Sequence, residues 1–143
     1  MRKLVTIFTV MVFAVSISCS QTTSQEGKSN KAPKIEFEYI EYDYGTIQQG
    51  ANGTCEFEFT NKGKEALLLT NVKSSCGCTV PSWPKEPVKK GDKSKIIVKY
   101  NTNRLGPINK TITVTSNADN SPIILKIKGK VIPKAEKTEE EEG

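Results

Sequence analysis

Hydrophobic and polar residues alternate over most of the chain between residues 33 and 133. The pattern is clearest where Cys55, Phe57 and Phe59 alternate with Glu56 and Glu58. A period of two residues is typical of a β-strand with one face in a hydrophobic core and the other in solvent. Cys55 is therefore expected on the same side of its strand as the two phenylalanines.

Similar segments recur at intervals of roughly ten residues, and turn-forming residues separate them. Strands are expected near residues 35–39, 42–47, 55–59, 66–74, 96–100, 112–116 and 123–131. Asn61-Lys62-Gly63-Lys64 is typical of a hairpin turn, and Pro81 to Pro87 reads as a longer turn. No helical period is present. The pattern predicts an all-β, immunoglobulin-like antiparallel β-sandwich of about seven strands over residues 33–133.

The segment that precedes this domain has the composition of a signal peptide. A basic start is followed by an apolar run from Leu4 to Ile17, which is short for a transmembrane helix. The run leads into Cys19 in a pattern that resembles the lipobox of bacterial lipoproteins, although Ser16 stands where leucine is usual. We predict a lipoprotein-type signal peptide over residues 1–18 and lipidation of Cys19. The alternative is an ordinary secretory signal in which Cys19 has no role.

Two polar segments flank the predicted domain. Residues 20–31 contain no apolar residue, so residues 19–32 are expected to form a flexible stalk between a membrane and the domain. Residues 134–143 include four consecutive glutamates, which repel one another. This segment is expected to be a disordered acidic tail.

Composition narrows the chemistry that the chain can perform. The sequence has no histidine, which excludes Ser-His-Asp and Cys-His catalysis as well as zinc sites built from histidine. Its net charge of +5 is compatible with an anionic partner, but it also suits a solvated surface. No aromatic and basic motif for nucleic acid is present. We therefore predict no catalytic residues, no cofactor and no nucleic-acid partner.

Two of the three cysteines in the predicted domain lie one residue apart in the segment Ser75-Cys76-Gly77-Cys78-Thr79, which we call the knuckle. An exported protein meets an oxidising compartment, so a disulfide is expected among Cys55, Cys76 and Cys78. A bridge from Cys55 to either knuckle cysteine would close a loop of about twenty residues. A bridge between Cys76 and Cys78 would close a very small ring that suits redox exchange better than stabilisation. The sequence leaves both pairings open.

The same three sulfurs also form a candidate metal site. Two thiolates one residue apart are a soft pair that suits Cu(I), and Cys55 is the one further cysteine of the predicted domain that could join them. Trp83, which lies between prolines just after the knuckle, is a candidate contact with a partner. Its alternative role is to cover the end of the sandwich core.

Several short motifs resemble a bacterial family of unknown function, the domain-of-unknown-function family 1573, over roughly residues 40–132. The matching motifs are Tyr44 to Ile47 with Gly50, Phe57 to Gly63, Ser75 to Thr79 with Trp83, Gly91, Tyr100-Asn101, Lys110 to Ile112, and Ser116-Asn117. The resemblance implies an immunoglobulin-like domain, often secreted or lipid-anchored, as in lipoproteins of the Bacteroidetes. The sequence is also similar to the abnormal-spindle/hydin class of modules, which are mostly interaction domains.

These observations lead to two hypotheses about function. The first is a non-enzymatic, lipid-anchored module of the cell envelope, in the outer membrane or periplasm, that binds a protein or a glycan or has a structural role. Its contact with the lipid bilayer would be made through Cys19. The second is a thiol-based copper-binding or redox protein that acts through Cys76 and Cys78.

Overall fold

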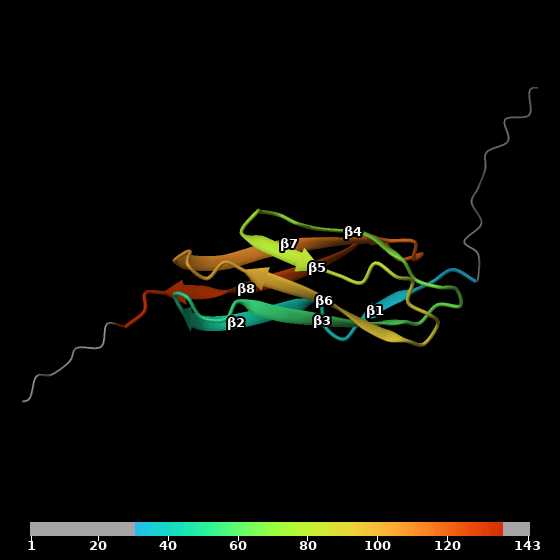
Figure 1. Ribbon diagram of the computed structural model, residues 1–143, viewed down its shortest axis with the longest axis horizontal. Coiled ribbons are helices and arrows are strands. Elements are labelled where there is room, and N and C mark those ends of the chain that lie inside the picture. Colours follow the sequence, from blue (N-terminus) through green and yellow to red (C-terminus); the bar gives the residue numbers. More distant parts are fainter. Residues whose placement is uncertain (1–30, 136–143) are drawn as a thin grey trace, which may run out of the picture.

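The computed structural model describes residues 31–135, which form a sandwich of two four-stranded β-sheets (Figure 1). The strands are β1 (Ile35–Phe37), β2 (Glu41–Gln48), β3 (Thr54–Asn61), β4 (Leu69–Ser74), β5 (Thr79–Ser82), β6 (Lys93–Tyr100), β7 (Gly106–Ser116) and β8 (Ile123–Ile132). Sheet A has the order β1-β3-β6-β5, and sheet B has the order β2-β8-β7-β4. The predicted all-β sandwich is confirmed. Within residues 31–135, no helix is long and apolar enough to cross a membrane.

The hydrophobic core lies between the two sheets and follows the alternation of the sequence. Phe57 and Phe59 of β3 are fully buried, as are Leu125 and Ile127 of β8 in the opposite sheet, while Glu58 is exposed. Burial of each large apolar side chain contributes about 1.5–3 kcal/mol relative to its exposure to water. The alternating pattern therefore fixes which face of each strand points inward.

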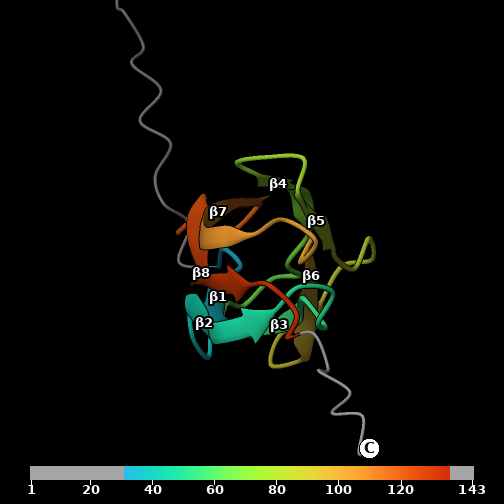
Figure 2. The same cartoon turned by 90° about the vertical axis from the view of Figure 1, so that its left-hand side faces the viewer.

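The two ends of the sandwich carry different parts of the chain. Residue 31 lies at one end, which we call the N-terminal end, where Ile35 pairs with Asn61 (Figure 1). Strand β3 begins at the opposite, far end, where Thr54 pairs with Lys99, and it ends at Asn61 at the N-terminal end. Figure 2 looks onto the far end and shows the β2–β3 and β6–β7 connections there. The predicted signal peptide, Cys19, and most of the stalk and tail lie outside the described residues.

The architecture differs from the expected one in two respects. Eight strands are present within residues 31–135, because Thr79–Ser82 forms β5 across the end of the knuckle and the start of the turn predicted at Pro81 to Pro87. Proline is tolerated there because β5 is an edge strand, which needs fewer N–H donors than a central strand. In addition, β2 pairs with β8 in parallel, so the sandwich is not wholly antiparallel. This pairing arises because the chain changes sheets between β1 and β2 and joins the free edge of β8.

The predicted hairpin at residues 61–64 is wrong, since the chain changes sheets at this point. Strand β3 belongs to sheet A and β4 to sheet B. The side chain of Asn61 causes the turn: its Oδ1 accepts from the Gly63 N–H at 3.0 Å, and its Nδ2 donates to the carbonyls of Glu65 and Val88 at 2.8 and 3.0 Å. Asn61 is fully buried, so these bonds organise the crossing from inside the fold.

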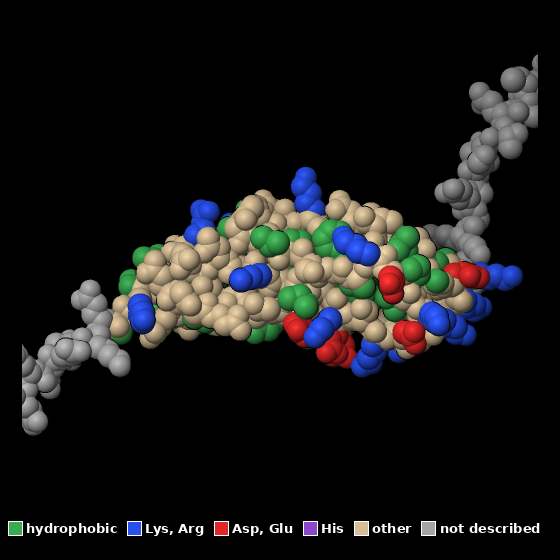
Figure 3. All heavy atoms as spheres, in the orientation of Figure 1, with side chains coloured by type: hydrophobic (Ala, Val, Ile, Leu, Met, Phe, Trp, Pro, Cys, Tyr) green, Lys and Arg blue, Asp and Glu red, His purple; other side chains and the backbone are tan. Residues whose placement is uncertain are grey.

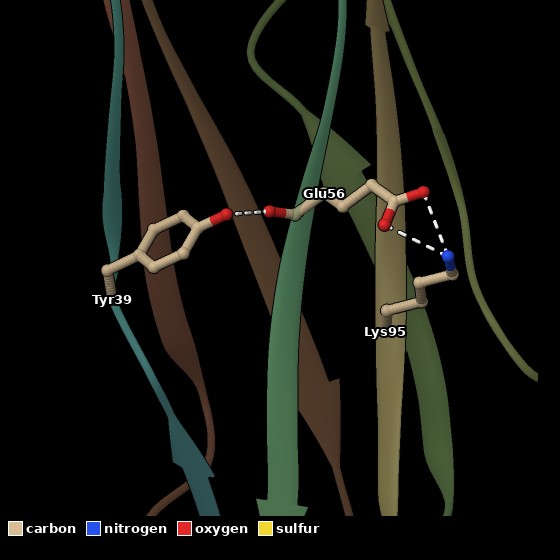
Figure 4. A network of polar contacts seen from close by, with 3 residues as sticks. All are labelled: Tyr39, Glu56 and Lys95. Atoms are coloured by element: carbon tan, nitrogen blue, oxygen red, sulfur yellow. Dashed lines mark hydrogen bonds and ion pairs between the residues drawn. The ribbon is translucent and has the colours of Figure 1, made fainter.

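The outer face of sheet A is held by polar contacts between neighbouring segments (Figure 4). Lys95 Nζ lies 2.9 Å from both carboxylate oxygens of Glu56, and the Tyr39 hydroxyl donates to the backbone carbonyl of Glu56. Exposed ion pairs of this kind usually contribute less than about 1 kcal/mol. We therefore interpret this network as part of an ordinary solvated face.

Candidate functional site

The knuckle is the short turn that carries the chain from β4 in sheet B to β5 in sheet A. Cys76 and Cys78 form a disulfide across this turn, with their Cα atoms 5.4 Å apart. Both cysteines are half-buried, and Gly77 between them is exposed. Of the two pairings that the sequence left open, the structure therefore contains the one with the small ring.

A ring this small constrains the unfolded chain only weakly. In the chain-entropy account, a bridge between residues two apart contributes about 1.5 kcal/mol, roughly half of what a fifteen-residue loop gives. The bond is therefore a minor contributor to stability. This contrasts with the alternative bridge to Cys55, which would have linked two distant strands.

Hydrogen bonds hold the knuckle in place independently of the sulfur bridge. The Ser74 hydroxyl is 2.5 Å from the Cys76 carbonyl and 2.6 Å from the Thr79 carbonyl. The Asn101 N–H donates to the Cys78 carbonyl at 2.9 Å, which ties the turn to the end of β6. On the other side, the Ser75 N–H donates to the Thr111 carbonyl of β7 at 2.9 Å. The turn is thus anchored to both sheets.

Cys55 is a free thiol buried in the core and cannot reach the knuckle. It lies on β3 opposite Val98, and β6 separates β3 from β5. Two strand spacings amount to about 9–10 Å, which exceeds the Cα separation that a disulfide can span. Burial raises the pKa of the Cys55 thiol, and a hydrogen bond with Tyr44 opposes that shift. Cys55 therefore behaves as a core residue that resists ionisation.

Trp83 follows β5 and packs against the hydrophobic core. Its indole Nε1 is buried and has no hydrogen-bond partner within the described part of the chain. The Lys85 ammonium lies 3.1 Å from the centre of the indole ring, where a cation is attracted by the π electrons. One side of the ring is thus against the core and the other is covered by Lys85. This placement favours a packing role over a partner contact.

An open groove of about 530 Å³ lies at the far end of the sandwich, beside the knuckle. It is lined by residues 50–53 before β3, by Gly77 and Cys78, by Val80 of β5, and by residues 99–103 at the end of β6. The groove brings together segments that are distant in the sequence. Nothing in the sequence showed that residues 50–53 would face Cys78.

The lining of the groove mixes polar and apolar groups and carries positive rather than negative charge. Lys99 is the charged side chain of its lining, which also includes three asparagines but no carboxylate. On the face shown in Figure 3, the far end of the described domain has basic but no acidic side chains. Val80 adds an exposed apolar side chain, at 63% exposure. The site therefore suits a ligand with apolar and hydrogen-bonding groups and no excess of positive charge.

Copper binding at Cys76 and Cys78 would require that their disulfide first be reduced to two thiols. As a disulfide, Cys76 and Cys78 are not thiolates, the form in which cysteine binds soft metals. Within residues 31–135, no group of three or more histidine, cysteine, aspartate or glutamate side chains is arranged to hold a metal ion. A Cu(I) site would thus require prior reduction of the knuckle.

The carboxylates of Glu41 and Asp43 on β2 both pair with Lys128 of β8. Lys128 Nζ lies 2.5 Å from a Glu41 oxygen and 3.7 Å from an Asp43 oxygen. The hydrogen bond with Glu41 is the main cause of the raised pKa of Lys128. Lys128 of β8 thus forms exposed ion pairs with two carboxylates of the neighbouring strand β2 in sheet B.

The fold is an immunoglobulin-like β-sandwich, and it is similar to that of PapD-like domains. The ASH/PapD-like domain 7 of human CEP192 superposes with a TM-score of 0.62 at 12% identity, over 83% of this chain and 99% of that one. The family model of proteins of unknown function DUF1573 matches residues 35–131, so the chain belongs to this family. The resemblance seen in the sequence is confirmed. No curated protein matches the sequence.

Other solved structures share the fold alone. A protein of unknown function from Porphyromonas gingivalis W83 superposes with a TM-score of 0.63 at 16% identity, over 76% of this chain. This chain spans about half of that protein, 51% of its length. The secreted serine protease VesC from Vibrio cholerae superposes with a TM-score of 0.55 at 13% identity. The superposition covers 72% of this chain but 24% of the protease.

Proposed function

We propose that this protein is a non-enzymatic module of the cell envelope that binds a partner in the groove at its far end. The observation that carries the proposal is the position of the groove, at the end of the sandwich opposite residue 31 (Figure 1). A lipid anchor at Cys19 would hold the N-terminal end near the membrane. The groove would then face away from the bilayer, where a partner can reach it.

The lining of the groove supports binding over catalysis. It contains no histidine and no carboxylate, which are the usual general bases of enzymes. The buried thiol of Cys55 lies in the core, and its pKa is raised by burial, so it is a poor nucleophile. The site thus offers shape, hydrogen bonds and one positive charge.

Between the two partner classes that the sequence allowed, the lining favours a protein segment over a glycan. Val80 presents an exposed aliphatic side chain at the rim, which suits an apolar side chain of a peptide. Tyr100, the aromatic residue of the lining, is 4% exposed, so its ring is not available as a stacking platform. Backbone groups and asparagines around the groove can pair with the main chain of such a segment.

A photo-crosslinking experiment in intact cells tests the proposed binding site. A photoreactive amino acid at Val80 is expected to give a discrete adduct with one envelope protein. The matched control is Ile124, which is 52% exposed but lies on β8 in sheet B, away from the groove. The same adduct from both positions, or none from position 80, would contradict a binding site in the groove. A glycan crosslinked at position 80 would support the groove as the binding site but would show that the partner is a glycan and not a protein.

The lipid anchor has a separate test. Replacement of the candidate lipidated residue, Cys19→Ala, is expected to move the protein from the membrane fraction to the soluble fraction, because one anchored terminus with several acyl chains supplies the membrane affinity. Cell fractionation followed by immunoblotting measures this shift. The control is Cys55→Ala, which changes a cysteine in the core and should leave the protein in the membrane fraction. If the Cys19→Ala chain stays with the membrane, the anchor is wrong.

A further inference from the structure

We propose that the Cys76–Cys78 disulfide is a site of thiol–disulfide exchange, which accepts two electrons from a dithiol that reaches Cys78 through the groove. Cys76 is the sulfur that leaves. This activity goes beyond binding, and it does not require that the groove hold a macromolecule. It rests on four features of the knuckle: access to one sulfur, a turn that survives reduction, a nearby hydroxyl donor and a lining without negative charge.

The two cysteines differ in their position relative to the groove, although both are half-buried and Cys78 also packs against the core. Cys78 lines the groove together with Gly77, whereas Cys76 is not part of the lining. The glycine has a structural meaning here. A Cβ added at Gly77 would meet no atom within 4 Å, and the residue does not have a positive φ, so the fold does not require glycine at this position. Its missing side chain leaves the approach to Cys78 open.

The backbone of the knuckle is expected to keep its conformation when the Cys76–Cys78 bond is reduced. Ser74, Asn101 and Thr111 hold the knuckle backbone through hydrogen bonds that do not involve sulfur. The ring closed by the disulfide spans a sequence separation of 2, so it restricts few conformations of the chain. Both redox states are therefore compatible with the same fold, as reversible exchange requires.

The surroundings favour the thiolates that exchange produces. The Thr79 hydroxyl is 3.8 Å from Cys76 Sγ and 3.9 Å from Cys78 Sγ, and in the disulfide state it is the hydroxyl that donates. Thr79 is 2% exposed, so this donor is fixed in place. Lys99 is the charged residue of the groove lining. A hydroxyl donor stabilises a thiolate, and the lining of the groove adds one cation and no carboxylate.

The reaction is a two-step exchange with a balanced transfer of electrons. A partner thiolate attacks Cys78 Sγ, a partner–Cys78 disulfide forms, the Cys76–Cys78 bond breaks, and Cys76 Sγ keeps the electron pair as a thiolate. The second thiolate of the partner then attacks the partner sulfur of this mixed disulfide. The partner ends as a disulfide, and the knuckle holds two thiolates that take up the two protons lost by the partner thiols. Reaction with another disulfide compound restores the starting state.

Glutathione disulfide is the probe that tests this inference. The full chain with Cys19→Ala is prepared in two forms, Cys76→Ser and Cys78→Ser, and the rate of mixed-disulfide formation is followed by intact mass and peptide mapping. We expect Cys78 in the Cys76→Ser chain to react about tenfold faster than Cys76 in the Cys78→Ser chain, since access controls such rates. Adding Gly77→Val to the Cys76→Ser chain should slow Cys78 about tenfold. Equal or reversed rates, or no effect of Gly77→Val, would overturn the proposal.

A second measurement needs no substitution in the domain. The Cys19→Ala chain is treated with dithiothreitol, and its thermal unfolding is compared with that of the oxidised chain. The proposal predicts that the reduced chain still unfolds cooperatively. The buried thiol of Cys55 reports on the fold in the same sample, because it should resist alkylation as long as the core is intact. Loss of the cooperative transition on reduction would show a structural disulfide and would contradict exchange.

Discussion

Gly63→Ala is expected to destabilise the domain by about 3 kcal/mol, at the upper end of what an added methyl group costs in a packed site. An added Cβ would lie within 3.0 Å of backbone atoms of Pro33 and Lys34. These atoms cannot move aside easily, because the Lys62 and Lys64 N–H groups donate to the carbonyls of Lys34 and Ala32. The loop and the first described residues are thus held together at backbone distance, which only glycine permits.

Thermal unfolding of the full chain measures this effect. For a domain of this size, Tm should fall by about 12 °C or more, at roughly 4–8 °C for each kcal/mol. Gly77→Ala is the matched control, since a Cβ there meets no atom within 4 Å. Its free energy of unfolding should change by no more than about 0.5 kcal/mol, as for a typical surface substitution, which corresponds to a Tm change of about 2–4 °C or less. Equal Tm values for the two variants would contradict the close approach at Gly63.

Asn61→Ala is expected to cost about 4 kcal/mol, because four hydrogen bonds of one buried side chain are lost together. Besides the Gly63, Glu65 and Val88 bonds, Asn61 Oδ1 accepts from the Lys34 N–H at 3.4 Å. Their backbone partners would be left unsatisfied in the interior, which costs more than the bonds themselves contribute. The substitution removes the side-chain bonds that join the start of β1, the β3–β4 crossing and the segment before β6, and it leaves the backbone bonds between them.

Chemical denaturation of the full chain provides the free energy of unfolding for this comparison. The control is Asn52→Ala, in an exposed loop where Asn52 Oδ1 accepts a single bond from the Thr54 N–H at 3.0 Å. That variant should lose about 1 kcal/mol or less. If Asn61→Ala loses no more than Asn52→Ala, the buried asparagine does not organise the crossing.

The sequence predicted the core better than it predicted the connections. The alternation in β3 and β8 identified Phe57, Phe59, Leu125 and Ile127 as inward-facing, because burial on one face imposes a period of two on a strand. Strand β5 was missed since Pro81 reads as a turn residue, and only its position at a sheet edge makes it compatible with a strand. Edge position is a property of the whole sheet and is not encoded locally.

The assignment of strands to sheets was also beyond the sequence. Asn61-Lys62-Gly63-Lys64 has the residues of a hairpin, yet the bonds of the Asn61 side chain direct the chain to the other sheet. The partners of that side chain include Val88, which is far away in the sequence. Local propensity carries no information about such a contact, so a tertiary interaction overrides the turn signal.

The candidate site was predicted in part. Cys76 and Cys78 were recognised in the sequence as candidate disulfide or metal-binding residues, and the structure joins them to each other in a disulfide. The groove beside them could not be predicted, because it forms between residues 50–53 and 99–103, whose proximity results from the pairing of β3 with β6. Chemistry carried by one short segment is visible in a sequence, whereas a binding surface assembled from several loops is not.

The Cys76–Cys78 pairing is the feature of the knuckle on which the exchange proposal depends, and a thiol map tests it most directly. The full chain is isolated under oxidising conditions, alkylated without a reductant, digested and analysed by mass spectrometry. Within residues 31–135, we expect a Cys76–Cys78 bridge inside one peptide and an alkylated Cys55 once the chain is unfolded. A peptide that joins Cys55 to the knuckle, or three alkylated cysteines, would contradict this pairing.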